Sequence, residues 1–270
     1  MTKPRKSPAE KVRLRGWKAF SGRGLKVRAG FCAADGEVLA GGPVELEFFV
    51  KNLGSTVLHV ALATDRVRLR PDFFSFSGDI AGTGLNKRGP KAAAGSRIQL
   101  IDPVEQFGYL GGPGGLMKVA PGETFSHRLL VNDFLNLETA QTKLKRGETG
   151  VLTVRCRRPL PLATTMRSAY KMGPDAPVAD VTLRLTIRRE DRALGRLIEK
   201  LAGDIRSRWP TFAAPEFERA ISILSALRIT EAVPALRMLG GHPDGGTRWR
   251  AMRALAIIEE RTDGAQGASR

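Results

Sequence analysis

The hydrophobic period of this chain changes near residue 190, from two residues to between three and four. Upstream, apolar and polar residues alternate, most regularly over residues 181–188, which is typical of strands with one face on a core and one in water. Downstream, from Leu194 to Ile205, apolar residues recur along one helical face. The sequence therefore predicts a β-rich part followed by a helical part. Only residues 188–190 join them, so we expect the helices to pack on the strands.

Turn signals divide the β-rich part into short strands. They include Asp35-Gly36, the Gly-Gly-Pro at 41–43 and the Ala-Pro-Gly-Glu at 120–123. Because no helical segment separates the strands, the pattern favours an antiparallel sandwich over a parallel sheet. The expected strands lie at residues 25–31, 44–50, 57–62, 67–70, 73–76, 96–101, 125–131, 149–156 and 181–188. Loops are expected at the glycine-rich residues 78–95 and 108–118 and the proline-containing residues 157–178.

Two motifs carry a resemblance to bacterial immunoglobulin-like domains. Residues 41–55 resemble the apolar strand followed by Asn-x-Gly that opens such domains, and residues 119–125 resemble the turn before a later strand. The resemblance covers residues 25–190 and implies an antiparallel immunoglobulin-like β-sandwich. In that family the sandwich is usually a non-catalytic adhesion, spacer or docking module. The chain departs from antibody-type domains because it lacks their Cys…Trp…Cys spacing.

The helical part contains a repeat, since residues 217–227 and 248–258 match at a spacing of 31 positions. A helix–turn–helix repeat of this period is typical of an α-solenoid. The segments at 215–228, 231–240 and 247–260 resemble short bacterial HEAT-type repeats, which implies protein–protein contact rather than chemistry. About one and a half units are present, fewer than an independent array needs, so we expect them to lean on the sandwich or a partner. The matched positions are Arg219 and Arg250, Ala220 and Ala251, Leu224 and Leu255, and Leu227 and Ile258.

Charge is concentrated at the N-terminus of a chain whose formal net charge is +17. A basic arm at residues 1–24 can neutralise phosphates on nucleic acid or anionic lipid; the alternative is a solvated, poorly ordered terminus. The predicted organisation is the arm (1–24), the sandwich (25–190), a HEAT-like helical cap (191–262) and a disordered tail (263–270). The basic residues near the N-terminus are Lys3, Arg5, Lys6, Lys11, Arg13, Arg15, Lys18, Arg23, Lys26 and Arg28.

The candidate binding residues lie in the helical part. Arg248, Trp249, Arg250 and Arg253 share the last expected helix, and Arg237 precedes it. Together they form a candidate patch for an acidic partner or a phosphate. The alternative is a solvated arginine face with Trp249 in the core.

The sequence carries no motif for chemistry. His59, His127 and His242 lack metal-ligand spacing, and no nucleophile elbow, P-loop or dinucleotide fingerprint occurs. We therefore predict no catalytic residue, metal site or cofactor, and no enzyme. A hydrolase built on His127 and Asp102 is the weakest alternative. Cys32 and Cys156 are expected to be buried hydrophobes; a single bridge would need an oxidising compartment.

These observations predict a class of role rather than a named partner. No run of about 18 apolar residues could span a membrane, and no apolar segment of a signal peptide follows the basic start. The sequence as written indicates the cytoplasm, and an upstream start would instead permit export. The expected function is a non-catalytic protein–protein interaction or assembly module. The alternative is a nucleic-acid or anionic-surface binder that uses the basic arm and the C-terminal arginines.

Overall fold

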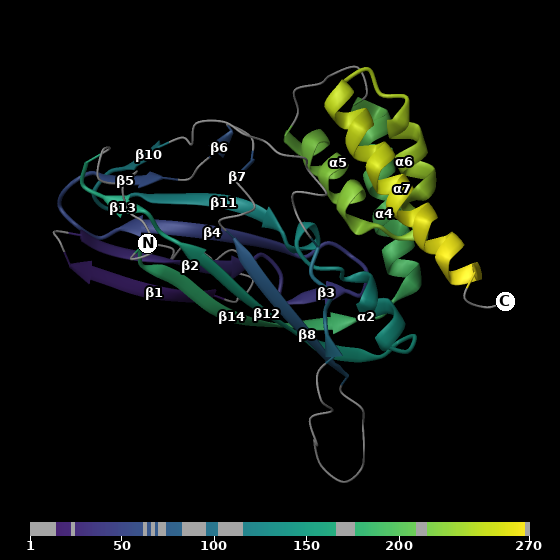
Figure 1. The fold of residues 1–270 in the computed structure, drawn as a ribbon, viewed down its shortest axis with the longest axis horizontal. Coiled ribbons are helices and arrows are strands. Elements are labelled where there is room, and N and C mark those ends of the chain that lie inside the picture. The colour runs from purple at the N-terminus through teal and green to yellow at the C-terminus, as the bar shows by residue number, and fades with distance from the viewer. Residues whose placement is uncertain are drawn as a thin grey trace, which may run out of the picture.

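The computed structural model describes residues 15–22, 25–61, 64–65, 68–69, 74–82, 96–101, 116–165, 176–208 and 215–267. Two larger β-sheets form an elongated body, and a group of helices lies at one end of it (Figure 1). The antiparallel β-sandwich followed by a C-terminal helical region agrees with the sequence prediction.

The first sheet is antiparallel and has the strand order β1-β2-β4-β11. Its inward side chains, such as Phe31, Phe48 and Val50, are fully buried because each strand alternates between core and outer face. The strands are β1 (Arg15–Gly22), β2 (Leu25–Ala33), β4 (Glu45–Asn52) and β11 (Thr124–Leu130).

The second sheet has the order β3-β14-β12-β8-β9 and is antiparallel except where β3 runs parallel to β14. Smaller sheets have the order β10-β5-β13 and pair β6 with β7. The second sheet comprises β3 (Glu37–Leu39), β8 (Ser75–Gly82), β9 (Ser96–Arg97), β12 (Thr149–Pro159) and β14 (Val178–Arg188). The others are β5 (Leu58–Ala61), β6 (Thr64–Asp65), β7 (Arg68–Leu69), β10 (Leu116–Val119) and β13 (Leu162–Ala163).

The core between the sheets is aromatic and contains a buried arginine. Phe31 and Phe48 from the first sheet meet Phe74 at ring-centroid distances of 6.2 and 5.6 Å. Arg158 of β12 is 0% exposed, and its Cζ lies 4.1 Å from the Phe74 centroid and 5.3 Å from the Phe48 centroid. The rings therefore stabilise the buried guanidinium through cation–π contact.

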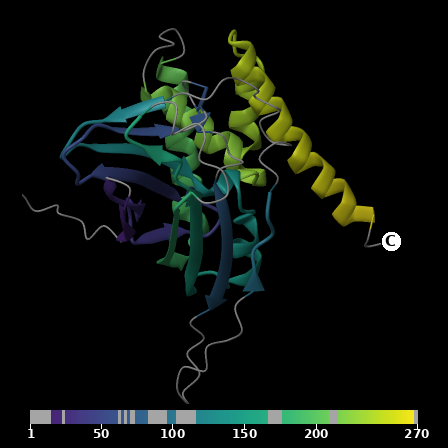
Figure 2. The same cartoon turned by 60° about the vertical axis from the view of Figure 1, so that its left-hand side comes forward.

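The helical region has its own hydrophobic core. Helix α4 packs on α5, α6 packs on α7, and α5 also contacts α7. Figure 2 shows α7 as a long helix whose C-terminal part extends beyond the other helices. The helices are η2 (Val131–Asp133), α2 (Glu138–Lys143), α4 (Asp191–Arg208), α5 (Pro215–Leu227), η3 (Thr230–Ala232), α6 (Val233–Gly240) and α7 (Gly245–Gly267).

The helical region packs on the end of the sandwich, as the short connection predicts. Leu130 of β11 belongs to the helical core, and Leu39 of β3 packs against that core. Arg219 of α5 also forms a two-bonded ion pair with Glu45 of β4. Apolar burial and this ion pair together attach the helices to the strands.

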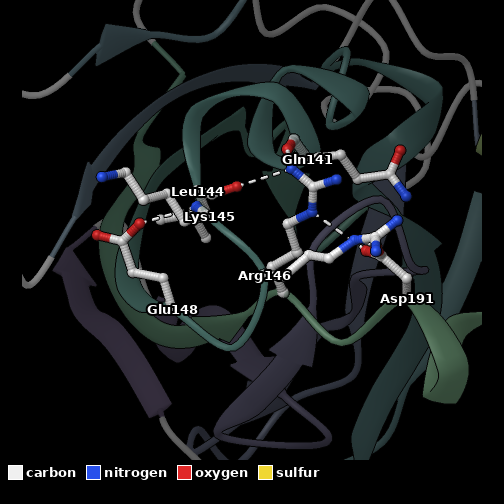
Figure 3. A network of polar contacts seen from close by, with 7 residues as sticks. Gln141, Leu144, Lys145, Arg146, Glu148 and Asp191 are labelled. Atoms are coloured by element: carbon white, nitrogen blue, oxygen red, sulfur yellow. Dashed lines mark hydrogen bonds and ion pairs between the residues drawn. The ribbon is translucent and has the colours of Figure 1, made fainter.

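A polar network fixes the point where β14 becomes α4 (Figure 3). Nη1 of Arg189 donates hydrogen bonds to the carbonyl oxygens of Gln141 and Leu144, the latter at 2.9 Å. Its Nε lies 3.1 Å from Asp191, which also accepts from Arg146 at 2.7 Å. The carbonyls at the C-terminal end of α2 are thus satisfied by a side chain from the junction.

Several predicted boundaries are wrong. Residues 15–22 form β1 and pair with β2, so the sheet includes part of the predicted arm; residues 1–14 and 23–24 lie outside the described residues. Strand β8 extends to Gly82, and β12 extends to Pro159. Helix α7 continues to Gly267, beyond the predicted start of the disordered tail. The remainders of the three predicted loops lie largely outside the described part of the chain. Cys32 and Cys156 are both buried, and neither is in a disulfide bond.

Candidate interaction surface on the helical region

The candidate surface is the side of α7 that faces away from the helical core. Ala251, Ala254 and Ile258 are buried on the inner side. Trp249 is 46% exposed and Met252 is 61% exposed. The alternative that Trp249 belongs to the core is therefore wrong. At 3.6 residues per turn, the residues opposite the core are Trp249, Met252, Arg253 and Ala256, which we call the outer α7 face.

The first turn of α7 is held by local hydrogen bonds. Asp244 accepts a bond of 2.7 Å from the backbone N–H of Thr247, the usual role of an N-cap residue. The hydroxyl and backbone N–H of Thr247 hold the pKa of Asp244 below its ordinary value. The backbone N–H of Asp244 in turn donates to Nδ1 of buried His242 at 3.1 Å. Trp249 therefore projects from a fixed helix start.

The predicted arginines occupy different environments. Nη1 of Arg248 donates to the carbonyl oxygens of His242 and Pro243, both at 2.7 Å, and Nε of Arg250 donates to Gly246 at 3.4 Å. Nη2 of Arg237 lies 4.0 Å from Glu259, and both side chains are exposed, so solvent screens that pair.

Arg253 is half-buried on the outer α7 face. Among the described residues, no contact pairs it with a carboxylate. The structure therefore places Trp249 and Arg253 on one face, with Arg248 and Arg250 on its two flanks. Arg237 approaches from α6.

Met252 and Ala256 are not among the binding residues predicted from the sequence. The signal that could have found them is the i, i+3, i+7 spacing of Trp249, Met252 and Ala256. This spacing gives α7 a second apolar stripe, opposite the stripe that enters the core. An ordinary surface helix has only one such stripe.

The three histidines lie on separate elements, with His59 on β5 and His242 just before α7. His127 lies on β11, and its pKa is lowered to about 4, first by burial and then by the charge of Arg158, so it is neutral near pH 7. Asp102, its partner in the weakest alternative, lies outside the described residues. The described ranges contain no group of three His, Cys, Asp or Glu side chains that could hold a metal ion. In the same ranges, no helix is both long and apolar enough to cross a membrane.

A cleft of about 230 Å³ lies where the helices meet the sandwich. Its charged groups pair with neighbours: Glu45 with Arg219, and Glu37 with Arg188 at 3.1 Å. These pairs make the cleft part of the joint between the two regions. Its lining is Ala34, Asp35, Glu37, Val38, Leu39, Pro43, Glu45, Leu185, Leu197 and Arg219.

No protein-family model matches the chain, and no curated protein matches it. Among solved structures, the chain is similar to Spo0M, a sporulation control protein from Bacillus subtilis, with 8% identity, a TM-score of 0.27 and coverage of 67% of this chain and 55% of Spo0M. It is also similar to a PapD-like (ASH) domain of human CEP192, with 12% identity, a TM-score of 0.22 and coverage of 69% and 97%.

A β-glucosidase from Listeria innocua gives 10% identity and a TM-score of 0.21, over 66% of this chain and 16% of the enzyme. The chain thus spans just over half of Spo0M and a small part of the enzyme. TM-scores this low do not establish a common fold. The sandwich is defined instead by its own strand order and register.

Proposed function

We propose that this chain is a non-catalytic interaction module that docks another protein on the outer α7 face. The observation that carries the proposal is the exposure of Trp249 and Met252, adjacent large apolar side chains opposite the buried side of α7. Trp and Arg are enriched among the residues that dominate protein–protein binding energy. A partner segment with an apolar anchor and carboxylates would match Trp249, Met252 and Arg253.

The repeat supports an architecture suited to such docking. Ala220 and Ala251 are both buried, as are Leu227 and Ile258, so these positions separated by 31 residues have similar environments. We assign the helices to a short HEAT-like array and the strands to an immunoglobulin-like sandwich that supports it. Helix α7 presents Trp249 and Met252 on its outer side, and neighbouring exposed apolar side chains of this size favour a partner over them.

The test uses the full chain, the double variant Trp249→Ala/Met252→Ala and the matched control Met117→Ala. Met117 is also an exposed apolar residue, 41% exposed, but it lies on β10 of the sandwich. Proteins captured from a native lysate by the wild type and the control, but not by the double variant, are purified and titrated by calorimetry. We expect the double variant to bind at least about tenfold more weakly, with unchanged thermal unfolding. The proposal would be overturned if the purified partner bound the wild type, the double variant and the Met117→Ala control with equal affinity.

Ionic strength separates this function from nucleic-acid or anionic-surface binding through residues 1–24 and the C-terminal arginines. A contact dominated by Trp249 and Met252 should lose little affinity as salt rises. An electrostatic contact would weaken steeply, because its binding energy comes largely from counterion release. A steep loss with salt, together with an unchanged affinity of the double variant, would favour the electrostatic alternative.

A further inference from the structure

The outer face of the first sheet carries two aromatic side chains in one row. The register pairs Trp17 of β1 with Gly30 of β2, and Gly30 with Phe49 of β4. The adjacent Phe31 and Phe48 are fully buried, so the row containing Trp17 points away from the core. Trp17 is 48% exposed, and Phe49 is half-buried.

Gly30 leaves the space between these aromatics without a side chain. A Cβ at this position would lie 2.1 Å from the carbonyl oxygen of Gly16 and 2.6 Å from Cα of Trp17, so only glycine fits. Two strand spacings separate Trp17 from Phe49, which puts their Cα atoms about 10 Å apart. The sheet thus presents two rings across a flat floor.

The next row supplies positive charge. Arg28 pairs with Lys51 across β2 and β4, and Lys26 follows on the same face of β2. The Arg28 Cζ lies 4.1 Å from the centroid of the Trp17 ring, and its Nε is buried without a hydrogen-bond partner. In the described part of the chain, neither Arg28 nor the two lysines pair with a carboxylate.

The row on the other side of Trp17 is of mixed charge. Register places Arg15, Cys32, Glu47 and Arg128 there, and the Cys32 thiol donates to Glu47 at 3.6 Å. Glu47 offsets one of the two arginines of that row, whereas the row of Arg28 and Lys51 contains two cations and no carboxylate. The chain also carries five basic residues ahead of β1: Lys3, Arg5, Lys6, Lys11 and Arg13.

We propose that this surface, formed by Trp17, Lys26, Arg28, Phe49 and Lys51, binds single-stranded nucleic acid. Aromatic rings stack on unpaired bases, and the adjacent cations neutralise the phosphate backbone. A duplex presents its bases already stacked, so it could use only the cations. A polyanion without bases would likewise leave Trp17 and Phe49 without a role. The site is separate from the outer α7 face, and its test does not depend on the docked protein.

The test measures the fluorescence anisotropy of labelled oligo(dT) and oligo(rU) with the full chain, with a duplex and heparin as competitors. We expect the single strands to bind and the duplex to compete poorly. Trp17→Ala/Phe49→Ala should weaken oligonucleotide binding about tenfold or more and leave heparin binding unchanged. Lys26→Ala/Lys51→Ala should weaken both and reduce the salt slope by about 0.7 for each lost phosphate contact.

Two controls protect the test against misfolding. Trp17→Phe should retain oligonucleotide binding, because it keeps a ring for stacking. Met117→Ala should bind the oligonucleotides like the wild type. Ultraviolet crosslinking followed by mass spectrometry should place the oligonucleotide on peptides that contain Trp17 or Phe49. Undiminished binding by a folded Trp17→Ala/Phe49→Ala variant would overturn the proposal. So would duplex binding as tight as single-strand binding, or crosslinks confined to other strands.

Discussion

Arg219 of α5 and Glu45 of β4 are 174 positions apart, and their side chains join the helical region to the sandwich. The guanidinium donates from Nε to one carboxylate oxygen at 2.7 Å and from Nη2 to the other at 2.5 Å. This two-bonded geometry fixes orientation as well as distance. The pair raises the pKa of Arg219 mainly through its hydrogen bond to Glu45.

Replacing Arg219 or Glu45 with alanine should lower the free energy of unfolding by about 0.5–1 kcal/mol each, because the pair is partly exposed to solvent. The double variant should lose less than the sum, since either single change already breaks the contact. Chemical denaturation of the four proteins measures this coupling. Strict additivity would show that the contact does not connect the two regions.

Arg189→Ala should be more destabilising, by about 1–3 kcal/mol, because it leaves the carbonyls of Gln141 and Leu144 without their donor. Arg146 provides a matched comparison, since it also pairs with Asp191 but is 84% exposed. Arg146→Ala should lower the free energy of unfolding by no more than about 0.5 kcal/mol. Thermal denaturation of both variants measures the difference. Similar losses would mean that the carbonyl contacts of Arg189 contribute nothing.

Two glycine-to-alanine substitutions should change the free energy of unfolding in opposite directions. Gly30→Ala places a Cβ against the backbone of β1 and should destabilise the protein by at least about 2 kcal/mol. Gly203 lies inside α4 with nothing near its missing Cβ, so Gly203→Ala should stabilise by about 0.5–1 kcal/mol. Urea midpoints of the two variants measure both effects. A neutral Gly30→Ala would contradict the close approach of β1 and β2.

His127 should make the protein less stable in mild acid. Its pKa is about 4 when folded, against an ordinary value of 6.5. The unfolded chain therefore takes up the proton first as pH falls, and stability that is complete above pH 6.5 declines toward pH 4. The loss should be on the order of 2 kcal/mol after solvent screening.

Urea denaturation from pH 7 to pH 4 measures this decline, and His127→Gln supplies the control. The variant cannot titrate at this position, so its stability should fall less over the same interval. Parallel curves for the two proteins would show that His127 is not responsible.

The strands with regular alternation were predictable, and those that depend on a neighbour were not. β12 and β14 bury every second residue, and the same alternation is visible in the sequence. β1 contains Gly16 and Gly22 and has no clear apolar face, so its extended form depends on pairing with β2. Arg158 occupies a position that the alternation of β12 assigns to the core. Only the folded arrangement shows that Phe48 and Phe74 accommodate its guanidinium.

The candidate surfaces, too, could be predicted only in part from the sequence. The sequence placed Arg248, Trp249, Arg250 and Arg253 on one helix, which α7 confirms. It could not decide which apolar stripe faces inward, because that depends on the small Ala251 and Ala254 packing in the helical core. Local periodicity could not predict the row that contains Trp17 and Phe49. It arises from pairing between strands that are distant in the sequence, and register is a tertiary property.

The direct passage from β14 into α4 restricts how the length of this chain can vary. One residue inserted between Arg188 and Asp191 would turn the following helix by about 100° and advance it by about 1.5 Å. Leu194 and Ile198 would rotate away from the core that they share with Leu130, and Arg189 would no longer align with both α2 and Asp191. Insertions and deletions should therefore be tolerated poorly at this junction, even though it lies between two regular elements where many proteins accept them.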